Sequence, residues 1–196
     1  TLQLLRESVA PGMTTADLDA IARESIASAG ATPSFLGYHG YPSSICVSVD
    51  SVVVHGIPGR EPLREGQVVS IDCGAVVDGW HGDAAFTAPV GDVSTEARHL
   101  IEVADASLDA AIAVMVAGNH LGDIGHAVES VARAAGLSVV EGYTGHAIGR
   151  AMHESPNVPN VGRPGGGARL RVGNVLAVEP MLVVGEPHTD VLDDEW

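Results

Sequence analysis

The fold of this chain is decided by the stretch Ile71-Asp72-Cys73-Gly74-Ala75-Val76-Val77-Asp78-Gly79-Trp80-His81-Gly82-Asp83. Asp78-Gly79 is typical of a two-residue β-hairpin turn, because a type I′ turn needs positive φ at both central positions. Such a turn places Asp72 and Asp83 as diagonal neighbours on one face, roughly 7–8 Å apart. Like charges this close repel each other unless a proton or a cation lies between them. From this stretch alone, a solvated acidic face and a cation site are equally good interpretations.

Length and composition restrict the classes of protein that are possible. The 196 residues fit one domain with a sizeable core, or two small domains. A net charge of −15 argues against binding to a nucleic-acid backbone as the main activity. The sequence shows no apolar run as long as a membrane span and no recognisable signal peptide. The two cysteines, Cys46 and Cys73, form no disulfide framework and are typical of a reducing cytoplasm. We therefore expect a cytoplasmic protein that acts on neither membranes nor nucleic acids.

Hydrophobic periodicity predicts helices and strands along the whole chain. Thr14, Thr15 and Asp17 are typical of a helix N-terminus, and Gly30 of the end of that helix. Periods of 3.6 residues predict helices at about 2–9, 15–29, 94–116 and 121–135. Alternating or β-branched runs predict a strand or hairpin at about 45–54 and strands at about 68–74, 80–88, 137–140 and 175–184. Glycine and proline predict a loop at 155–167.

The second half of the sequence repeats the first. The matching segments are Gly12 with Gly118, 37–41 with 142–146, and 63–72 with 170–179. Their offsets are 106, 105 and 107 residues, and three chance matches in register are not plausible. We predict two copies of a helix-then-strands unit, at about 1–90 and 91–196, joined by the helix from Ser94 to Val116.

The repeat has a chemical consequence, because it makes Glu179 equivalent to Asp72. Each acid ends an apolar strand, where a carboxylate is costly unless it is paired or coordinated. Two such units packed about a pseudo-twofold axis would bring the acids toward the interface between the halves. Asp72, Asp83, Glu179 and one imidazole would form an oxygen-rich site that suits Mn, Fe, Co or Zn. Two close ions need bridging carboxylates of this kind.

The imidazole must come from one of nine histidines. A single histidine is more often a satisfied or surface residue, and His99, His120 and His126 fit that interpretation because they lie in helical segments. His146 lies among small residues that permit close approach, and His153 and His55 also flank breaks beside the acidic strands. We expect His146 to be functional.

Five motifs, taken together, resemble those of type I methionine aminopeptidases. They are Val54-His55-Gly56-Ile57-Pro58, Ile71-Asp72 with Asp78–Asp83, Gly145–Arg150, Met152-His153-Glu154 and Val178-Glu179-Pro180-Met181. The match covers essentially the whole chain. It implies an α/β (α+β) pita-bread fold: one catalytic domain of two pseudo-twofold-related α/β halves, with a curved, mostly antiparallel sheet backed by helices. It also implies a cytoplasmic hydrolase that removes the initiator methionine of nascent proteins when the second residue is small.

The resemblance implies roles for the acids and for His146. Asp72 and Asp83 are similar to the two aspartate ligands, with Asp83 bridging, and His146 to the only nitrogen ligand. Glu179 is similar to a glutamate ligand that is also a candidate general base. The implied cofactors are two divalent metal ions (Co, Mn, Fe or Zn) that share a water or hydroxide, lower its pKa and polarise the carbonyl that it attacks.

The resemblance also implies a substrate site. His153 is similar to the residue that hydrogen-bonds the scissile carbonyl and its oxyanion, and His55 to the one near the scissile amide nitrogen. The implied methionine pocket is formed by Tyr38, His39, Tyr41, Cys46 and Trp196, with Phe35 and Met152 near its wall. The implied partner is the N-terminal methionine of nascent chains, with the ribosome exit region as a possible second partner, and the protein is expected to be a monomer.

Two positions depart from the family pattern. Ala147 stands where the family usually has glycine, a small change. The family also has a second glutamate ligand on a later return strand, and no residue up to Trp196 matches it, because Glu186 and Glu195 do not lie in the required motif. We therefore expect the C-terminal return strand to be missing from this chain.

Two alternatives stay open at this point. One is a proline-directed aminopeptidase or prolidase relative, which would use the same metal residues; the loop Tyr38–Tyr41 and the short chain favour methionine instead. The other is a non-catalytic pita-bread module that binds peptides or proteins, which the missing ligand favours and the remaining ligands oppose. A serine hydrolase and a His-Glu-x-x-His metalloprotease are disfavoured, because neither motif is present.

Overall fold

The chain divides into two units, and the structure, a computed structural model, describes residues 1–194 and 196. Unit 1 comprises Thr1–Arg98, Arg150–Met152 and Val191–Trp196, and unit 2 comprises His99–Gly149 and His153–Asp190. Among the helices of the described residues, none combines the length and the apolar character that crossing a membrane requires.

Unit 1 is organised around the hairpin of β3 (Val68–Val77) and β4 (Trp80–Pro89). The turn residues have φ of 52° at Asp78 and 76° at Gly79, which confirms the predicted positive φ at both positions. The register pairs Asp72 with Ala85 and Gly74 with Asp83, as predicted from the turn. The hairpin therefore carries both carboxylates on one face.

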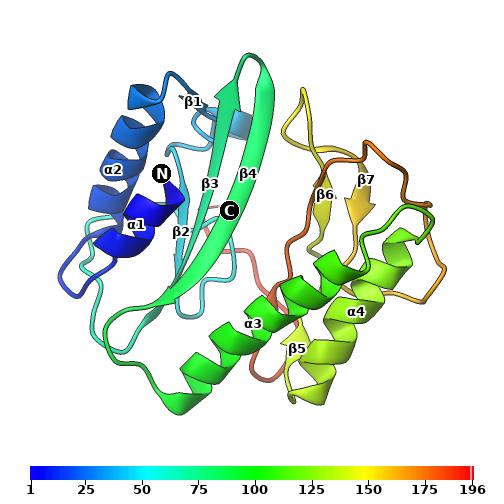
Figure 1. Cartoon of the computed structure of the whole chain (residues 1–196). Helices are drawn as coiled ribbons and strands as arrows, with labels where there is room; N and C mark the ends of the chain where they lie inside the picture. The colour runs from blue at the N-terminus through cyan, green and yellow to red at the C-terminus, as the bar shows by residue number, and fades with distance from the viewer. Residues whose placement is uncertain (195) are drawn as a thin grey trace. The chain divides into compact units, whose positions relative to one another are not determined.

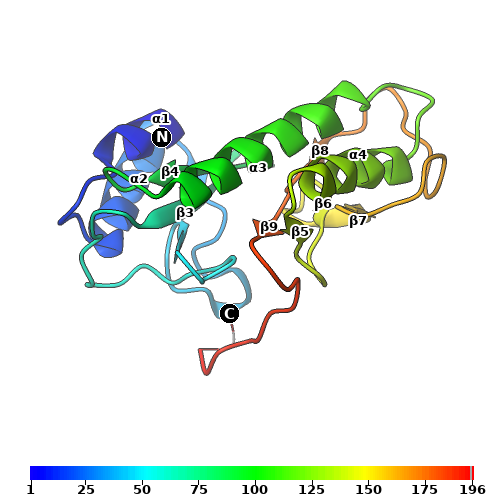
Figure 2. The same ribbon diagram turned by 90° about the horizontal axis from the view of Figure 1, so that it is seen from below.

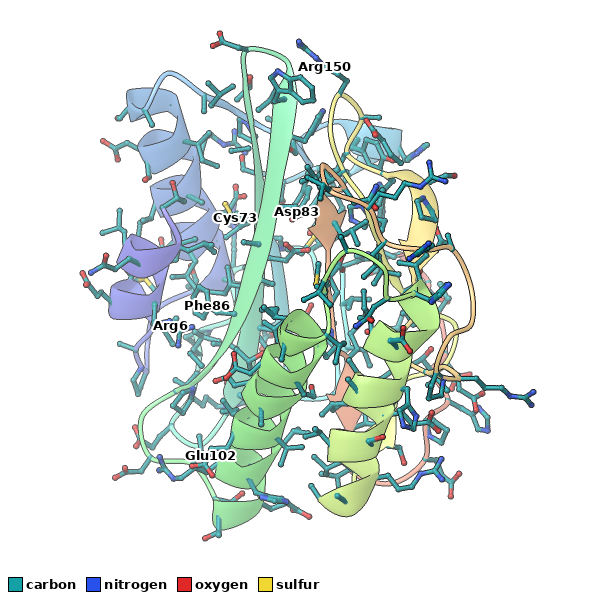
Figure 3. The ribbon with its side chains drawn as sticks, turned by 45° about the vertical axis from the view of Figure 1, so that its right-hand side comes forward. Arg6, Cys73, Asp83, Phe86, Glu102 and Arg150 are labelled. Atoms are coloured by element: carbon teal, nitrogen blue, oxygen red, sulfur yellow. The ribbon has the colours of Figure 1, made fainter. Side chains whose placement is uncertain are left out.

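Two helices cover the other face of this hairpin. They are α1 (Leu2–Ser8) and α2 (Thr15–Ser28), which lie together on one side of the sheet (Figure 1). Strands β1 (Thr32–Pro33) and β2 (Cys46–Val49) pair antiparallel with β3. The core between helices and sheet includes Leu5, Leu18, Ile26, Val69, Ile71 and Cys73. At the edge of this core, the Arg6 guanidinium lies 4.4 Å from the centroid of the Phe86 ring (Figure 3).

The strand or hairpin predicted at 45–54 is one shorter strand, β2, which ends at Val49. Asp50 has a φ of 51°, which takes the backbone out of the extended conformation. Its carboxylate accepts hydrogen bonds from the Val68 N–H at 2.9 Å and from Gln67 Nε2 at 2.7 Å. The Asp50 N–H still donates to the Val68 carbonyl at 2.9 Å, and the side-chain bonds hold Asp50 at the point where the strand ends. The capping box predicted for α2 is confirmed, with Thr14 and Asp17 bonding each other reciprocally.

Unit 2, like unit 1, consists of helices packed against strands, and its strands are short. Helix α3 (Thr95–Ala113) begins in unit 1 and continues in unit 2. Helix α4 (Leu121–Ala134) contacts β5 (Ser138–Val139) and β7 (Glu154–Val158), which can be followed from below in Figure 2. One sheet has the order β7-β6-β8, with β6 at Gly145–Ala147 and β8 at Leu176–Ala177, and β5 pairs with β9 (Leu182–Val183). The core includes Ala111, Leu121, Ile124, Val128, Val158 and Leu170.

One strand prediction and one loop prediction in unit 2 are corrected. The strand predicted at 175–184 is two short strands, β8 and β9, with different partners. Pro180 lies between them and has no N–H to donate to a ladder, and Asn160 Nδ2 donates to the Glu179 carbonyl at 2.6 Å in the interruption. The loop predicted at 155–167 begins inside β7, where Pro156 conceals the strand signal.

The duplication in the sequence is also present in the hydrogen bonds. In unit 1 the Gly12 N–H donates to the Leu63 carbonyl at 2.8 Å, and in unit 2 the Gly118 N–H donates to the Leu170 carbonyl at 3.0 Å. The second capping box, formed by His120 and Asp123, is equivalent to that of Thr14 and Asp17. The two units therefore begin in the same way, although their later strands differ.

Gly122 provides a test of the packing in unit 2. A Cβ atom on Gly122 would lie 2.3 Å from the Arg163 carbonyl oxygen and 2.8 Å from that of Gly166, both backbone atoms. We expect Gly122→Ala to lower the free energy of unfolding by about 1–3 kcal/mol, despite the better helix propensity of alanine. Denaturant titration measures this change. Gly82→Ala is the control, because nothing lies within 4 Å of its Cβ position; equal midpoints for the two variants would contradict the packing argument.

Candidate metal centre and substrate pocket

Unit 1 presents two half-buried carboxylates, Asp72 and Asp83, on the face of the hairpin opposite the helices. Asp83 can be followed on the hairpin in Figure 3. Cys46 pairs across from Asp72, so its side chain belongs to the same face. Gly74 lies between the acids in this pattern, and a Cβ there would meet the Phe35 ring at 2.8 Å. Glycine is thus required where the Phe35 ring packs beside the acids.

The thiols near these acids are neutral at physiological pH. Burial raises the pKa of Cys46 to about 12, and the negative charges of Asp72 and Asp83 act in the same direction. Burial also raises the pKa of Cys73, on the opposite face, to about 11. In the metal-free protein, the charged groups on this hairpin face are therefore the carboxylates.

Unit 2 presents an imidazole and a carboxylate in contact. His146 is buried in β6, and its Nδ1–H donates to the Ala147 carbonyl at 3.0 Å. Its Nε2 atom lies 3.2 Å from Glu179 Oε1. When Nδ1 carries the proton of a neutral ring, Nε2 and Oε1 are both acceptors, and two acceptors at this distance call for a shared proton or cation. A ring oriented by such a backbone bond is typical of metal-binding histidines.

His153 lies beside His146 in unit 2. The centroids of the two rings are 4.2 Å apart, and His153 is exposed whereas His146 is buried. An exposed imidazole next to a buried one can contact a bound substrate while the buried ring is held in place. This arrangement agrees with the different roles that the resemblance implies for the two histidines.

An apolar cluster in unit 1 contains most of the predicted methionine pocket. Its buried members are Phe35, Tyr41, Cys46 and Met152, and its partly buried members are Tyr38, Ile57 and Trp196. The Trp196 ring meets Tyr41 edge-on at 4.9 Å between centroids. Ile57 was not predicted, although its place in the motif His55-Gly56-Ile57-Pro58 was a usable signal.

Two predicted residues lie at the margin of this cluster. His39 is exposed in the short helix η1 (Tyr38–Gly40), has a φ of 48°, and its ring meets that of Tyr38 at 4.3 Å. The His55 ring lies 6.3 Å from that of Trp196. Partial burial of the His55 ring lowers its pKa from the usual 6.5, although the residue remains exposed overall. His55 is therefore neutral at physiological pH.

Arg150 has a structural role that was not predicted from the sequence. Its Nη1 donates to the Asp78 carbonyl at 2.8 Å, and its guanidinium lies 4.1 Å from the centroid of the Trp80 ring, at the hairpin tip (Figure 3). These contacts anchor the segment Arg150–Met152, which belongs to unit 1 and ends with a residue of the apolar cluster. The only signal was the arginine that ends the motif Gly145–Arg150.

These donors fit a divalent metal ion. Carboxylates and a single imidazole are ligands for Mn, Fe, Co or Zn. In unit 1 two like charges share a face, and in unit 2 two acceptors face each other. Both arrangements are stabilised by a cation.

Comparison with known proteins identifies relatives along the whole chain. Residues 1–193 match metallopeptidase family M24. Methionine aminopeptidase 1 of Mycobacterium tuberculosis is 54% identical over 202 residues, which cover 100% of this chain and 76% of that protein. The crystal structure of methionine aminopeptidase from Rickettsia prowazekii has a TM-score of 0.98 at 41% identity, over 100% of this chain and 79% of that one. Prolidase from Pyrococcus furiosus has a TM-score of 0.74 over 93% of this chain and 52% of that one, but at 17% identity this likeness shows the fold alone.

These likenesses confirm the predicted α/β pita-bread fold and decide the class of enzyme. The protein is a metal-dependent exopeptidase, a hydrolase that uses divalent metal ions as cofactors. The chain belongs to metallopeptidase family M24 and, within it, to the methionine aminopeptidases.

Proposed function

We propose that this protein removes the N-terminal methionine of newly made proteins whose second residue is small. The observation that carries the proposal is the 54% identity, over the entire chain, with a protein named methionine aminopeptidase 1. The apolar cluster of unit 1 supports it, because an unbranched thioether side chain needs an apolar pocket lined by aromatic rings.

The proposed metal ligands are Asp72 and Asp83 of unit 1 and His146 and Glu179 of unit 2. Asp83 is the proposed bridging ligand, since a carboxylate has two oxygens that can each bind one ion. When bound, divalent ions lower the pKa of water and polarise the peptide carbonyl. The backbone bond from His146 Nδ1 to Ala147 supports this assignment, because it directs the Nε2 lone pair toward Glu179.

The remaining roles concern proton transfer and orientation of the substrate. Glu179 is the proposed general base, because its carboxylate can accept a proton from water and pass it to the leaving amine. His153 donates a hydrogen bond to the scissile carbonyl oxygen, where negative charge develops. His55, neutral at physiological pH, lies near the scissile nitrogen. Tyr38, His39, Tyr41, Cys46 and Trp196 hold the methionine side chain.

The proposed partners are peptides and nascent chains with N-terminal methionine. Their N-termini emerge at the ribosome exit region, which is the proposed place of action of a cytoplasmic monomer. The net charge of −15 supports the absence of direct nucleic-acid specificity. The prolidase-like and the non-catalytic alternatives are not retained, because the close relatives carry the name methionine aminopeptidase.

The direct test is release of methionine from the tripeptide Met-Ala-Ser by the purified protein supplied with Mn or Co. We expect release from this peptide, none from Leu-Ala-Ser, and retention of metal after dialysis. Absence of methionine release in every metal would overturn the proposed function. Cleavage of a peptide with proline in second place in preference to Met-Ala-Ser would favour the prolidase alternative.

The first variant to test this proposal is Asp83→Asn. The amide cannot supply the charge of a bridging ligand, so we expect turnover of Met-Ala-Ser to be abolished while the fold, followed by circular dichroism, is kept. Asp78→Asn in the same hairpin is the control, because asparagine tolerates the positive φ of the turn. Unchanged activity of Asp83→Asn at saturating Mn or Co would exclude Asp83 as a bridge.

The second variant, His153→Ala, separates metal binding from catalysis. We expect it to keep its metal content, measured by elemental analysis, and to lose about 10²-fold in kcat, as when an oxyanion donor is removed. His188→Ala is the control, because that exposed ring pairs with Glu141 elsewhere in unit 2. If His153→Ala lost its metal instead, His153 would be a ligand and the assigned role would be wrong.

A further inference from the structure

Two polar residues, Thr15 and Asp19, lie one turn apart on α2 and are both buried. Asp19 Oδ1 accepts hydrogen bonds from the Ser44 N–H at 2.6 Å and from the Ile45 N–H at 3.2 Å. Thr15 Oγ1 accepts a hydrogen bond from the Gly59 N–H at 2.7 Å. One face of this helix thus holds two separate loops by their backbone amides.

These two loops carry the proposed methionine pocket. Ile45 directly precedes Cys46, and the Tyr41 hydroxyl lies 3.2 Å from the Ile45 carbonyl oxygen and 2.9 Å from that of Gly56. Gly56 and Gly59 belong to the second loop, which also contains Ile57 of the apolar cluster. Asp19 thus binds the first loop at Ser44 and Ile45, and the Tyr41 hydroxyl lies between the Ile45 and Gly56 carbonyls of the two loops. The second loop is bound to α2 again, through the Gly59 N–H and Thr15.

The repeat shows that the fold itself does not need these polar groups. At the same offset of 106 residues that relates Asp17 to Asp123, Thr15 and Asp19 correspond to Leu121 and Gly125. Gly125 packs backbone to backbone, since a Cβ there would lie 2.7 Å from the Val161 carbonyl oxygen. The equivalent helix of unit 2 is thus packed without polar side chains at these two positions. Unit 1 differs from unit 2 in having the two loops that carry the proposed methionine pocket, and the buried pair Thr15 and Asp19 binds these loops.

The energetics of Asp19 agree with a positioning role. A carboxylate in a buried position is costly unless it is fully bonded. Here Oδ1 receives two amide bonds and Oδ2 receives Arg23 Nη2 at 3.2 Å. Charge-assisted bonds from backbone amides are short and directional, so they fix the position of Ser44 and Ile45 relative to α2.

We propose that Asp19 and Thr15 are positioning residues that set the shape of the methionine pocket through the Ser44–Ile45 and Gly59 amides, and thereby its preference for methionine. The inference rests on the proposed function, because it takes the apolar cluster of unit 1 as the site of the substrate side chain. Neither residue touches the reacting atoms, so their effect is on binding and selectivity and not on the chemical step.

The kinetic test compares Asp19→Ala, Asp19→Asn and Thr15→Val on Met-Ala-Ser and on the same peptide with N-terminal norleucine. For Asp19→Ala, which removes the acceptor of both amide bonds, we expect KM for Met-Ala-Ser to rise about tenfold, while kcat changes less than about threefold. The ratio of kcat/KM for methionine over norleucine should fall. Asp19→Asn keeps a neutral acceptor and should be intermediate, and Thr15→Val should raise KM less than Asp19→Ala.

Two matched controls separate positioning from simple loss of helix stability. Asp17→Ala breaks the capping box of α2 but touches neither pocket loop. Arg23→Ala removes the partner of Oδ2 and leaves both amide bonds to Oδ1. We expect wild-type KM and selectivity from both controls. If Asp17→Ala raised KM as much as Asp19→Ala, the effect would be one of helix stability and the inference would be overturned.

Amide hydrogen exchange gives a readout that does not depend on activity. In Asp19→Ala, exchange at the Ser44 and Ile45 amides should be at least about tenfold faster than in Asp17→Ala, because these amides lose their acceptor. Unchanged exchange would overturn the positioning role whatever the kinetics show. Faster exchange with unchanged KM and selectivity would overturn the link to the pocket and leave the proposed function standing. Failure of the wild type to release methionine would instead overturn the proposed function, while exchange still decides whether Asp19 holds the loop.

Discussion

Repulsion between two carboxylates on one face of the β3–β4 hairpin is the constraint on which the rest of this structure depends. Asp72 and Asp83 share that face because the Asp78-Gly79 turn holds the register, and a slip of one residue would move one acid to the core side. The opposite face is packed against α1 and α2, which makes such a slip costly. The apolar core thus holds two like charges together, and a bound cation is what such a pair favours.

Because of the duplication, a similar architecture occurs twice in the chain and carries different functional groups in the two units. Each unit begins with the same capping box and the same backbone bond from a glycine to a leucine carbonyl. Beyond that shared start, unit 1 places acids and an apolar cluster on its sheet, whereas unit 2 places a buried imidazole against Glu179. The polar face of α2 extends this divergence, because its equivalent in unit 2 is leucine and glycine.

The errors of the sequence analysis have physical causes. The strand predicted at 45–54 stops early because Asp50 leaves the extended conformation and bonds the Val68 amide. The strand predicted at 175–184 is divided at Pro180, and its two parts have different partners. The strand β7 escaped detection because its own proline resembles a loop signal. In the first case a side-chain hydrogen bond decided where the strand ends, and in the other two cases a proline separated the local pattern from the observed strands.

The motifs of the sequence predict which residues bind metal and methionine, and these roles stay predictions. The sequence by itself determined the hairpin and its register, the helix caps and the duplication. These features follow from local rules: positive φ at Asp78-Gly79, side-chain caps, and repeated spacing. Only the tertiary structure decided that Arg150 binds the Asp78 carbonyl, that Asp19 holds the Ser44 amide, and that His146 faces Glu179. The first two contacts join residues 72 and 25 positions apart, and all three depend on how the chain packs, which no local pattern of side chains encodes.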